Sequence, residues 1–463
     1  MKHISSVMIA AASAAAIFSC TPRRAALPVG VFDSGTGGFT VLEKILALDA
    51  FDNATGENDP DGVPDLLNED FQYLADQANM PYGKYDAEGK ASYLTDLAVK
   101  DAFFLIGDGY CKDASSIAND CIKSGVKIVV IGCNTATAYG LDAIRDTLKA
   151  LGADIDVIGV VEAGSRSAVE YLESRFDEAS VGVLATPGTI SSGVYERMLK
   201  AAAGDDLRLQ VVSQSGYGFA GAVDEEKEYV DKSLTTFSDS YLGPVLGTSE
   251  DSIFPDLLPC YGFDFTGNKA FLETSPDGKP LRIQLNSPDN YARFNIVNLV
   301  AKAVDAGLEE PLRCVILGCT HYPFELATLR RTLSDLRAYQ DENGARPYER
   351  FIAEDCIFVD PAENTALDCY LALKERGLLS RRKTPGTLDA FISVPSAHLP
   401  DSCLAPGGGL AYWYKYGREI NDPTVSTVVV PMSKNTVNED NMRRVEKLLP
   451  NCWKLLSEKH HFD

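Results

Sequence analysis

Histidine and basic residues are scarce in this chain. Only 5 of its 463 residues are histidine, which excludes a histidine-rich metal site. The 11 cysteines are scattered and contain no Cys-x-x-Cys pair, so neither a zinc site nor a redox motif is indicated. Basic residues number 43 against 66 acidic ones, giving a net charge of −23. Because no basic stripe is available to bind phosphates, we do not expect a nucleic-acid partner.

Long apolar runs are also absent after the first 20 residues, so no membrane-spanning helix of about 20 residues is predicted. Residues 1–20 have a basic start and an apolar run from Val7 to Phe18, a pattern typical of a secretory signal. The ending Ile17-Phe18-Ser19-Cys20 resembles a bacterial lipobox, which implies lipidation at Cys20. The alternative is an ordinary signal peptide in which Cys20 is incidental. We expect export to the periplasm and a membrane contact only through a lipid anchor at Cys20.

Two sequence phrases each occur twice, in the same order. An apolar strand leading into a turn and a helix is found at 29–35 and again at 181–186. A β-branched strand ending in Gly-Cys is found at 127–135 and again at 313–321. Apolar strands that alternate with helices favour parallel sheets covered on both faces. The repetition predicts an α/β protein with two similar parallel-sheet domains, a pseudo-two-fold relation and an active-site cleft between them.

The repeat also predicts how the chain is divided. We expect a first α/β domain that carries a C-terminal extension, built from residues 28–157 and 322–463, and a second α/β domain over residues 158–321. Three stretches have turn-rich composition or poor periodicity and are interpreted as additions to this plan: 48–70, about 232–290, and 380–435. The chain is expected to close with one amphipathic helix from about Asn438 to Leu456.

Cys133 and Cys319 are the residues of the repeated phrase with obvious chemistry. Each follows a predicted strand and precedes a predicted helix, whose first N–H groups and dipole stabilise a thiolate. A lone cysteine at a strand end is usually a small buried apolar residue. Two in repeated contexts argue for chemistry instead, because polar residues suited to a carboxylate or an enolate oxygen follow each sulfur: Asn134, Thr135, Thr320 and His321.

Six motifs in order, over roughly residues 28–365, resemble those of the glutamate racemase family. They are Val29 to Gly38, Asp76 to Gly83, Gly132 to Ala138, Thr186 to Thr189, Leu317 to Pro323, and Val359 to Ala362. The resemblance implies a racemase that needs no cofactor and acts on glutamate or a related acidic amino acid. One thiol removes the α-proton and the other returns a proton to the opposite face. The two sulfurs would then lie about 7 Å apart around the α-carbon.

The resemblance also implies roles for individual residues. Cys133 and Cys319 would be the catalytic thiols, with Asp33 assisting the first and His321 the second. A further catalytic acid falls within Ala222 to Glu226, where Asp224 and Glu225 are both candidates and a solvated helix face is the alternative. The predicted substrate-binding residues are Asp33, Ser34, Pro81, Tyr82, Gly83, Asn134, Thr135, Thr189, Thr320 and His321. Whether the protein forms a homodimer is left open.

One acidic loop needs a separate interpretation. Asp59, Asp61 and Asp65 alternate around Gly62, and they resemble the calcium loops of thrombospondin-type repeats. Such loops usually come in tandem and this one is single. A plain acidic surface loop is therefore the favoured interpretation, and calcium is the alternative.

Two other functions fit the same sequence. A periplasmic amino-acid-binding lipoprotein would keep the cleft and lose catalysis, but retention of Cys133, Cys319, Asp33 and His321 argues against it. A decarboxylase would use only one thiol, and the two intact cysteine motifs disfavour it. The leader and the insertion at 232–290 leave open which acidic amino acid is the substrate.

Overall fold

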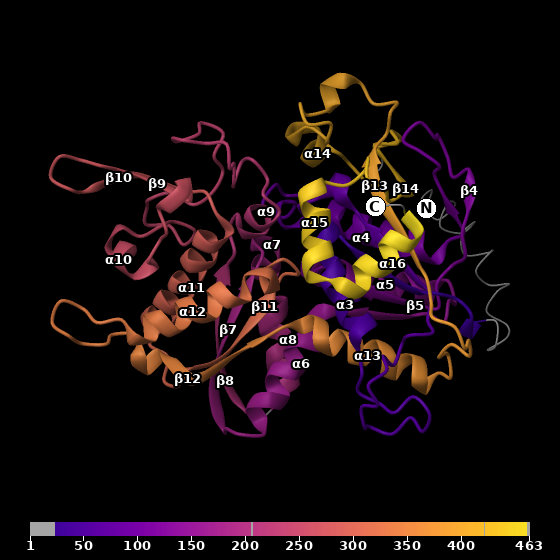
Figure 1. Ribbon diagram of the computed structural model, residues 1–463, viewed down its shortest axis with the longest axis horizontal. Coiled ribbons are helices and arrows are strands. Elements are labelled where there is room, and N and C mark those ends of the chain that lie inside the picture. The colour runs from indigo at the N-terminus through magenta and orange to yellow at the C-terminus, as the bar shows by residue number, and fades with distance from the viewer. Residues whose placement is uncertain (1–23, 205–206, 421, 461–463) are drawn as a thin grey trace. The chain divides into compact units, whose positions relative to one another are not determined.

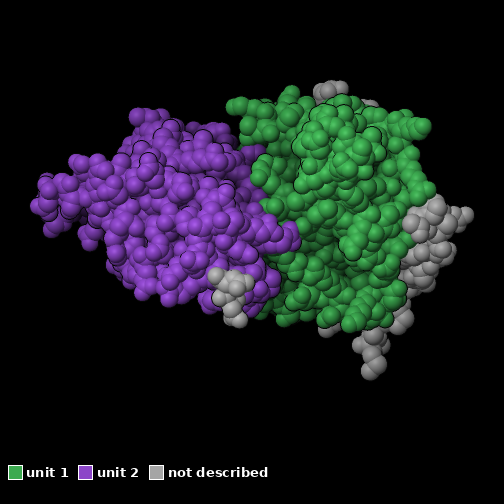
Figure 2. All heavy atoms as spheres, turned by 90° about the horizontal axis from the view of Figure 1, so that it is seen from below, with its two compact units in different colours: residues 1–163, 362–463 green, residues 164–361 purple. Residues whose placement is uncertain are grey.

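The computed structural model describes residues 24–204, 207–420 and 422–460 (Figure 1). The chain divides into two compact units, residues 1–163 with 362–463 and residues 164–361 (Figure 2). The predicted signal and Cys20 lie outside the described residues. Within the described part, no helix has the length and apolar character needed to cross a bilayer.

Unit 1 is built on a six-stranded sheet in the order β14-β13-β2-β1-β5-β6. All neighbouring strands run parallel except β13 and β14, which are antiparallel. The central strands β1, β2 and β5 are buried along their whole length, as expected for a parallel sheet covered on both faces. The strands are β1 (Val29–Asp33), β2 (Phe71–Ala75), β5 (Ile128–Ile131), β6 (Asp156–Gly159), β13 (Leu388–Pro395) and β14 (Thr427–Pro431).

Helices cover both faces of this sheet. On β2, Tyr73 stacks against Phe39 of α3, and the α16 thiol of Cys452 donates to the Phe39 carbonyl. The next residue, Leu74, faces the other way into the core formed with α4 and α5. The helices of the unit are α3 (Phe39–Ala47), α4 (Ala91–Ile106), α5 (Asn134–Ala150), α13 (Pro361–Glu375), α14 (Tyr412–Gly417), α15 (Glu439–Leu448) and α16 (Pro450–His460). A small antiparallel pair, β3 (Gly109–Tyr110) and β4 (Cys121–Ile122), lies between α4 and β5 in the chain.

The closing helix is two helices. The prediction of one helix from Asn438 to Leu456 was wrong at its centre, because α15 ends at Leu448 and α16 begins at Pro450. Proline has no N–H to donate to the preceding turn, but it is well tolerated at the first position of a new helix. The break therefore falls where the sequence places the proline.

Unit 2 contains a four-stranded parallel sheet in the order β12-β11-β7-β8. The strands are β7 (Glu178–Ala185), β8 (Arg208–Ser215), β11 (Leu312–Gly318) and β12 (Ile352–Val359). The helices are α6 (Val160–Glu173), which begins in unit 1, α7 (Pro187–Ser191), α8 (Val194–Ala203), α9 (Phe219–Val223), α10 (Leu258–Tyr261), α11 (Pro288–Asp305) and α12 (Leu326–Ala338). The stretch predicted as an insertion carries α10 and the antiparallel hairpin β9 (Ala270–Thr274) and β10 (Pro280–Leu285).

The repeated phrases occupy equivalent places in the two sheets. Strands β1 and β7 carry the first phrase, and β5 and β11 carry the second. In unit 1, β1 is adjacent and parallel to β5, and in unit 2, β7 is adjacent and parallel to β11. The order β2-β1-β5-β6 in unit 1 matches β8-β7-β11-β12 in unit 2. The predicted α/β class with a parallel sheet in each half is therefore confirmed. The pseudo-two-fold relation and the cleft stay predictions.

The unit boundaries differ from the predicted ones. The first crossing falls within α6, a few residues past the expected residue 157. The return to unit 1 comes at residue 362, whereas residue 322 was expected. The reason is β12, which pairs with β11 and so keeps α12 and the strand itself in unit 2. No local pattern indicated that one more helix–strand pair after the second cysteine motif belongs to this unit.

Candidate active site

Two predicted site residues of unit 1, Asp33 and Cys133, lie at one edge of its sheet. Asp33 is the last residue of β1, and Cys133 follows β5 after a single glycine; Asp76, which opens the second family motif, follows β2. These three strands are neighbours and run parallel, so their carboxyl ends meet at the same edge. This edge is where open α/β sheets bind ligands.

Cys133 is the N-cap residue of α5. Its Sγ accepts a hydrogen bond from the Ala136 N–H at 3.4 Å, and the Ser34 hydroxyl oxygen lies 3.6 Å away. The side chain is buried, and Asn134 and Thr135 form the first turn of the helix beside it. A sulfur in this position lies at the positive end of the helix dipole, which favours its thiolate form.

Asp33 lies close to Gly132, the residue before Cys133. Its Oδ1 accepts hydrogen bonds from the Gly35 N–H at 2.9 Å and from the Ser34 hydroxyl at 3.4 Å. A β-carbon placed on Gly132 would come within 3.6 Å of Asp33 Oδ2, so the carboxylate borders the residue that precedes Cys133. The site therefore brings a buried carboxylate, a hydroxyl and a thiol together from two adjacent strands.

Tyr82 is in the predicted substrate-binding segment, but its hydroxyl is already occupied. It lies 2.5 Å from Asp76 Oδ2 and 2.7 Å from Asp101 Oδ2. Burial and the Asp76 charge raise the pKa of Asp101 well above its ordinary value. The Tyr82 hydroxyl is therefore within hydrogen-bond distance of both carboxyl groups. Sequence reasoning missed Asp101, although a carboxylate inside the apolar stretch of α4 was the available signal.

In unit 2 the second cysteine lies at the equivalent strand end. Cys319 follows β11 directly, and its Sγ is 3.5 Å from His321 Nδ1. His321 Nε2 is 3.0 Å from Asp224 Oδ2 at the end of α9. All three side chains are buried. Thiol, imidazole and carboxylate thus form one hydrogen-bonded chain.

Asp224 and Glu225 are clearly different in their surroundings. Asp224 is 6% exposed and bonds His321, whereas Glu225 has φ of 56° and pairs with Lys232 at 2.5 Å. Of the two acids, only Asp224 contacts His321 in the described part of the chain.

The neighbours of His321 favour the charged form of its imidazole. Burial alone lowers the pKa of this imidazole, but the Asp224 carboxylate and the Cys319 sulfur raise it more strongly, so the result lies well above the usual value. Nδ1 of this imidazole lies within hydrogen-bond distance of the Cys319 sulfur, which allows a proton to pass between the two atoms.

Cys319 differs from Cys133 in the local structure on its C-terminal side. No helix begins at Cys319; Thr320 and His321 lead into a short 3-10 turn over Tyr322–Glu325. The expectation that both sulfurs cap a helix is therefore wrong for Cys319, where Pro323 and the tight turn postpone the helix to α12.

Thr189 lies after the neighbouring strand of the same sheet. Thr186 caps α7 at the end of β7, which pairs with β11, and the hydroxyls of Thr186 and Thr189 are 2.9 Å apart. The carboxyl ends of β7 and β11 meet at one edge of the sheet. Thr189 and Cys319 therefore belong to the same edge of unit 2.

Two carboxylates of the acidic loop accept hydrogen bonds from backbone N–H groups of the same loop. Asp61 accepts from the Asn53 and Val63 N–H groups, and Asp65 accepts from those of Ala50 and Phe51. Throughout residues 24–204, 207–420 and 422–460, no group of three or more His, Cys, Asp and Glu residues could hold a metal ion. The calcium interpretation of Asp59, Asp61 and Asp65 therefore gains no support from the structure.

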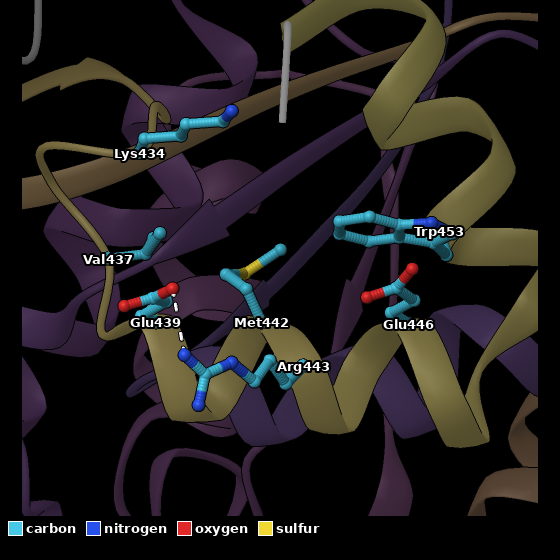
Figure 3. Close-up of a pocket in the computed structure, with 7 residues that line it drawn as sticks. All are labelled: Lys434, Val437, Glu439, Met442, Arg443, Glu446 and Trp453. Carbon is cyan, nitrogen blue, oxygen red and sulfur yellow. Dashed lines mark hydrogen bonds and ion pairs between the residues drawn. The ribbon is translucent and has the colours of Figure 1, made fainter. Parts of the chain in front are cut away.

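A hollow of about 600 Å³ lies on the C-terminal extension, and no predicted site residue lines it. Figure 3 shows its apolar members Val437, Met442 and Trp453 among charged side chains, with Arg443 bonded to Glu439. Its lining residues are Lys434, Val437, Glu439, Met442, Arg443, Glu446 and Trp453.

Comparison with known proteins places the chain in a family. The family model for Asp/Glu/Hydantoin racemase matches residues 105–236. The glutamate racemase of Ralstonia pickettii is 33% identical over 242 residues, which cover 52% of this chain and 67% of the relative. The glutamate racemase of Geobacter metallireducens is 24% identical over 393 residues, which cover 84% and 97%.

Among solved structures, glutamate racemase isoform RacE1 from Bacillus anthracis is 19% identical with a TM-score of 0.46, and the match covers 79% of this chain and 88% of that one. The match to the Ralstonia pickettii relative combines identity above 30% with coverage of two thirds of the relative. The chain belongs to the glutamate racemase family and is an enzyme of the amino-acid racemase type.

Proposed function

We propose that this enzyme interconverts L- and D-glutamate with Cys133 and Cys319 as its two acid/base thiols. The observation that carries the proposal is their equivalent placement: each sulfur follows the equivalent strand of its own sheet, β5 or β11, and each has polar partners at hand. Family membership supports the reaction type, and the name of the relatives supports glutamate as substrate.

The proposed reaction is a proton exchange at one carbon. One cysteine, as thiolate, takes the α-proton and becomes a thiol, leaving a carbanion whose charge spreads onto the carboxylate. The other cysteine, as thiol, gives its proton to the opposite face and becomes a thiolate. One proton leaves and one arrives, so no oxidant or cofactor is needed. The roles exchange for the other enantiomer.

The two thiols would be activated by different means. At Cys133 the contributions are the α5 N-terminus and the Ser34 hydroxyl, with the Asp33 carboxylate alongside. At Cys319 the contribution is the His321 imidazolium, fixed through Nε2 by Asp224. Because Nε2 is engaged with the carboxylate, Nδ1 is the nitrogen that faces the sulfur. Asp33 and Asp224 are therefore positioning acids of the two halves.

The predicted substrate contacts are the polar groups beside each sulfur. Ser34, Asn134 and Thr135 accompany Cys133 at one sheet edge, and Thr189 and Thr320 accompany Cys319 at the other. Hydroxyl and amide donors of this kind stabilise a carboxylate on which negative charge develops. Since the Tyr82 hydroxyl is used internally, the Pro81-Tyr82-Gly83 segment would contribute through its backbone.

The experiment is deuterium incorporation. Purified protein is incubated with L- or D-glutamate in D2O, and the α-deuterium and the enantiomer ratio are followed. The wild type should exchange and racemise, and Cys133→Ala and Cys319→Ala should each lower racemisation by about 100-fold or more. Cys121→Ser and Cys356→Ser remove thiols away from the two sites and should leave the rate unchanged.

The outcome separates the alternatives. Binding of glutamate without exchange in the wild type would favour a non-catalytic amino-acid-binding protein. If only one of the two cysteine variants loses activity, a reaction that uses one thiol would be favoured. If α-deuterium is incorporated into another acidic amino acid and not into glutamate, the proposed substrate is wrong and the proposed two-thiol reaction stands.

We also propose that the protein is exported and anchored by a lipid at Cys20, on the strength of the N-terminal sequence. Expression with labelled fatty acid tests this directly. The full-length protein should carry label in the membrane fraction, and Cys20→Ser should lose it. Equal labelling of the variant would contradict the proposal.

A further inference from the structure

A short helix of the C-terminal extension packs on the predicted substrate-binding segment. The helix is α14, and with the residue after it the segment covers Tyr412–Arg418; we call these residues the α14 brace. Lys415 Nζ donates to the Met80 carbonyl at 2.5 Å, and the Tyr416 hydroxyl donates to the Pro81 carbonyl at 3.4 Å. The brace therefore bonds the backbone just before Tyr82 and Gly83.

Arg418 is the central residue of the brace. It is only 4% exposed, and a buried guanidinium needs partners for its donors. Its Nη2 donates to Asn79 Oδ1 at 2.6 Å and to the Tyr85 hydroxyl at 3.1 Å, and its Nε donates to the Lys415 carbonyl. The guanidinium also lies over the ring of Tyr93, 5.1 Å from its centroid.

The contacts continue from Arg418 to the substrate-binding segment through one amide. Asn79 accepts from Arg418 with its Oδ1 and donates with its Nδ2 to both oxygens of Asp76, at 2.8 and 2.9 Å. Asp76 in turn accepts from the Tyr82 hydroxyl. Because a polarised amide lies between the guanidinium and the Asp76 carboxylate, each bond in this chain supports the next.

The segment itself has little regular structure to hold it. It consists of two 3-10 turns, Gln77–Asn79 and Tyr82–Lys84, with Met80 and Pro81 between them. A segment without a helix or sheet ladder depends on side-chain contacts to stay in one conformation. Here those contacts come from a part of the chain more than 300 residues away.

We infer that Arg418 is a positioning residue for substrate binding: the α14 brace fixes the Asn79–Tyr85 segment in the conformation that receives the amino acid. The inference rests on the proposed function for the identity of the substrate. Arg418 contacts the segment and not the reacting atoms. Its loss should therefore weaken substrate and transition-state binding alike, which raises KM and leaves kcat nearly unchanged.

The test compares three full-length variants with the wild type. Arg418→Met keeps the length of the side chain and removes the charge and the donors; it should raise KM for glutamate at least 10-fold with kcat within about 3-fold. Arg418→Lys keeps the charge without the fork and should recover part of the KM. Met442→Ala, a buried residue of α15 in the same extension, should lower Tm without changing KM.

Amide hydrogen exchange gives a readout that does not need activity. In Arg418→Met, the amides of residues 79–85 should exchange faster while those of the central strands β1 and β5 stay protected. Unchanged exchange at 79–85 would overturn the brace. Faster exchange with an unchanged KM would overturn its role in substrate binding. If the wild type neither binds nor racemises glutamate, the proposed function is wrong, and so is the role of Arg418 in binding this substrate. Hydrogen exchange would still show whether the α14 brace holds residues 79–85.

Discussion

Asp224 is the hydrogen-bond partner of His321 Nε2. Its carboxylate meets Nε2 of the imidazole at 3.0 Å, and both side chains are buried. An ion pair in such surroundings fixes the ring orientation as well as its charge. The charge and orientation of His321, which contacts Cys319, therefore depend on Asp224, a residue 95 positions before Cys319 in the chain.

Asp224→Asn should lower racemisation by about 100-fold, because His321 loses the charge that keeps it protonated and oriented. The alkaline limb of the pH–rate profile should move to lower pH, since the carboxylate no longer raises the pKa of His321. The measurement is kcat/KM over a pH series. Glu225→Gln is the matched control, and an equal loss in that variant would contradict the assignment of Asp224.

The same pair predicts a pH-dependent contribution to stability. The pKa of His321 is raised in the folded protein, so the pair stabilises fully below the unfolded value of about 6.5 and loses its effect as pH rises through the folded value. Urea unfolding of wild type and Asp224→Asn should therefore show a larger difference at pH 6 than at alkaline pH. A difference that grows with pH would contradict this.

At the scale of elements, the chemistry lies where strands end. Cys133 caps α5, so under the proposed mechanism a single side chain would serve the reaction and the helix. Thr186 caps α7 and Ser287 caps α11 in the usual way, with a hydroxyl oxygen. A sulfur is a weaker acceptor than such an oxygen, which makes Cys133 an unusual helix cap.

Cys133→Ser and Cys133→Ala should differ in stability although both lose racemisation. Serine keeps an acceptor for the Ala136 N–H, whereas alanine leaves it without one, at a cost of about 1 kcal/mol. The check is the unfolding free energy in urea for both variants. An alanine variant as stable as the serine variant would show that the Sγ contact does not cap the helix.

Much of the element plan could be predicted because it is local. The apolar phrases at 127–135 and 313–321 contain their own strand, turn and polar residues, so both cysteines and His321 could be proposed as site residues from the sequence. The choice between Asp224 and Glu225 could not be made, since it depends on a contact with His321, 97 residues further along the chain. The break at Pro450 was available in the sequence, but the amphipathic periodicity on either side hid it.

At the scale of the whole chain, contacts between distant segments hold unit 1 together. Lys127 is buried and donates to Glu69 Oε2, to the Ala25 carbonyl and to the Leu378 carbonyl. Glu69 in turn accepts from the Ser380 N–H. Four stretches of sequence thus meet at one ammonium group. No local pattern encodes this meeting, just as none linked Arg418 to Asn79, because each partner depends on the completed fold.

Lys127→Met should destabilise the protein by roughly 3–5 kcal/mol, because it leaves the Glu69 carboxylate buried without its cation. Adding Glu69→Gln should recover part of this loss, since the buried charge is then removed as well. Denaturant unfolding of the single and double variants measures both effects. A double variant less stable than Lys127→Met would contradict the explanation.

The central claim is that two thiols act on one carbon, and a crystal structure of the enzyme with bound D-glutamate tests it most directly. The quantities to measure are the distances from the α-carbon to Cys133 Sγ and to Cys319 Sγ. We expect both distances to be about 3.5 Å, with the two sulfurs on opposite faces of the carbon. A ligand that contacts only one sulfur, or two sulfurs on the same face, would contradict it.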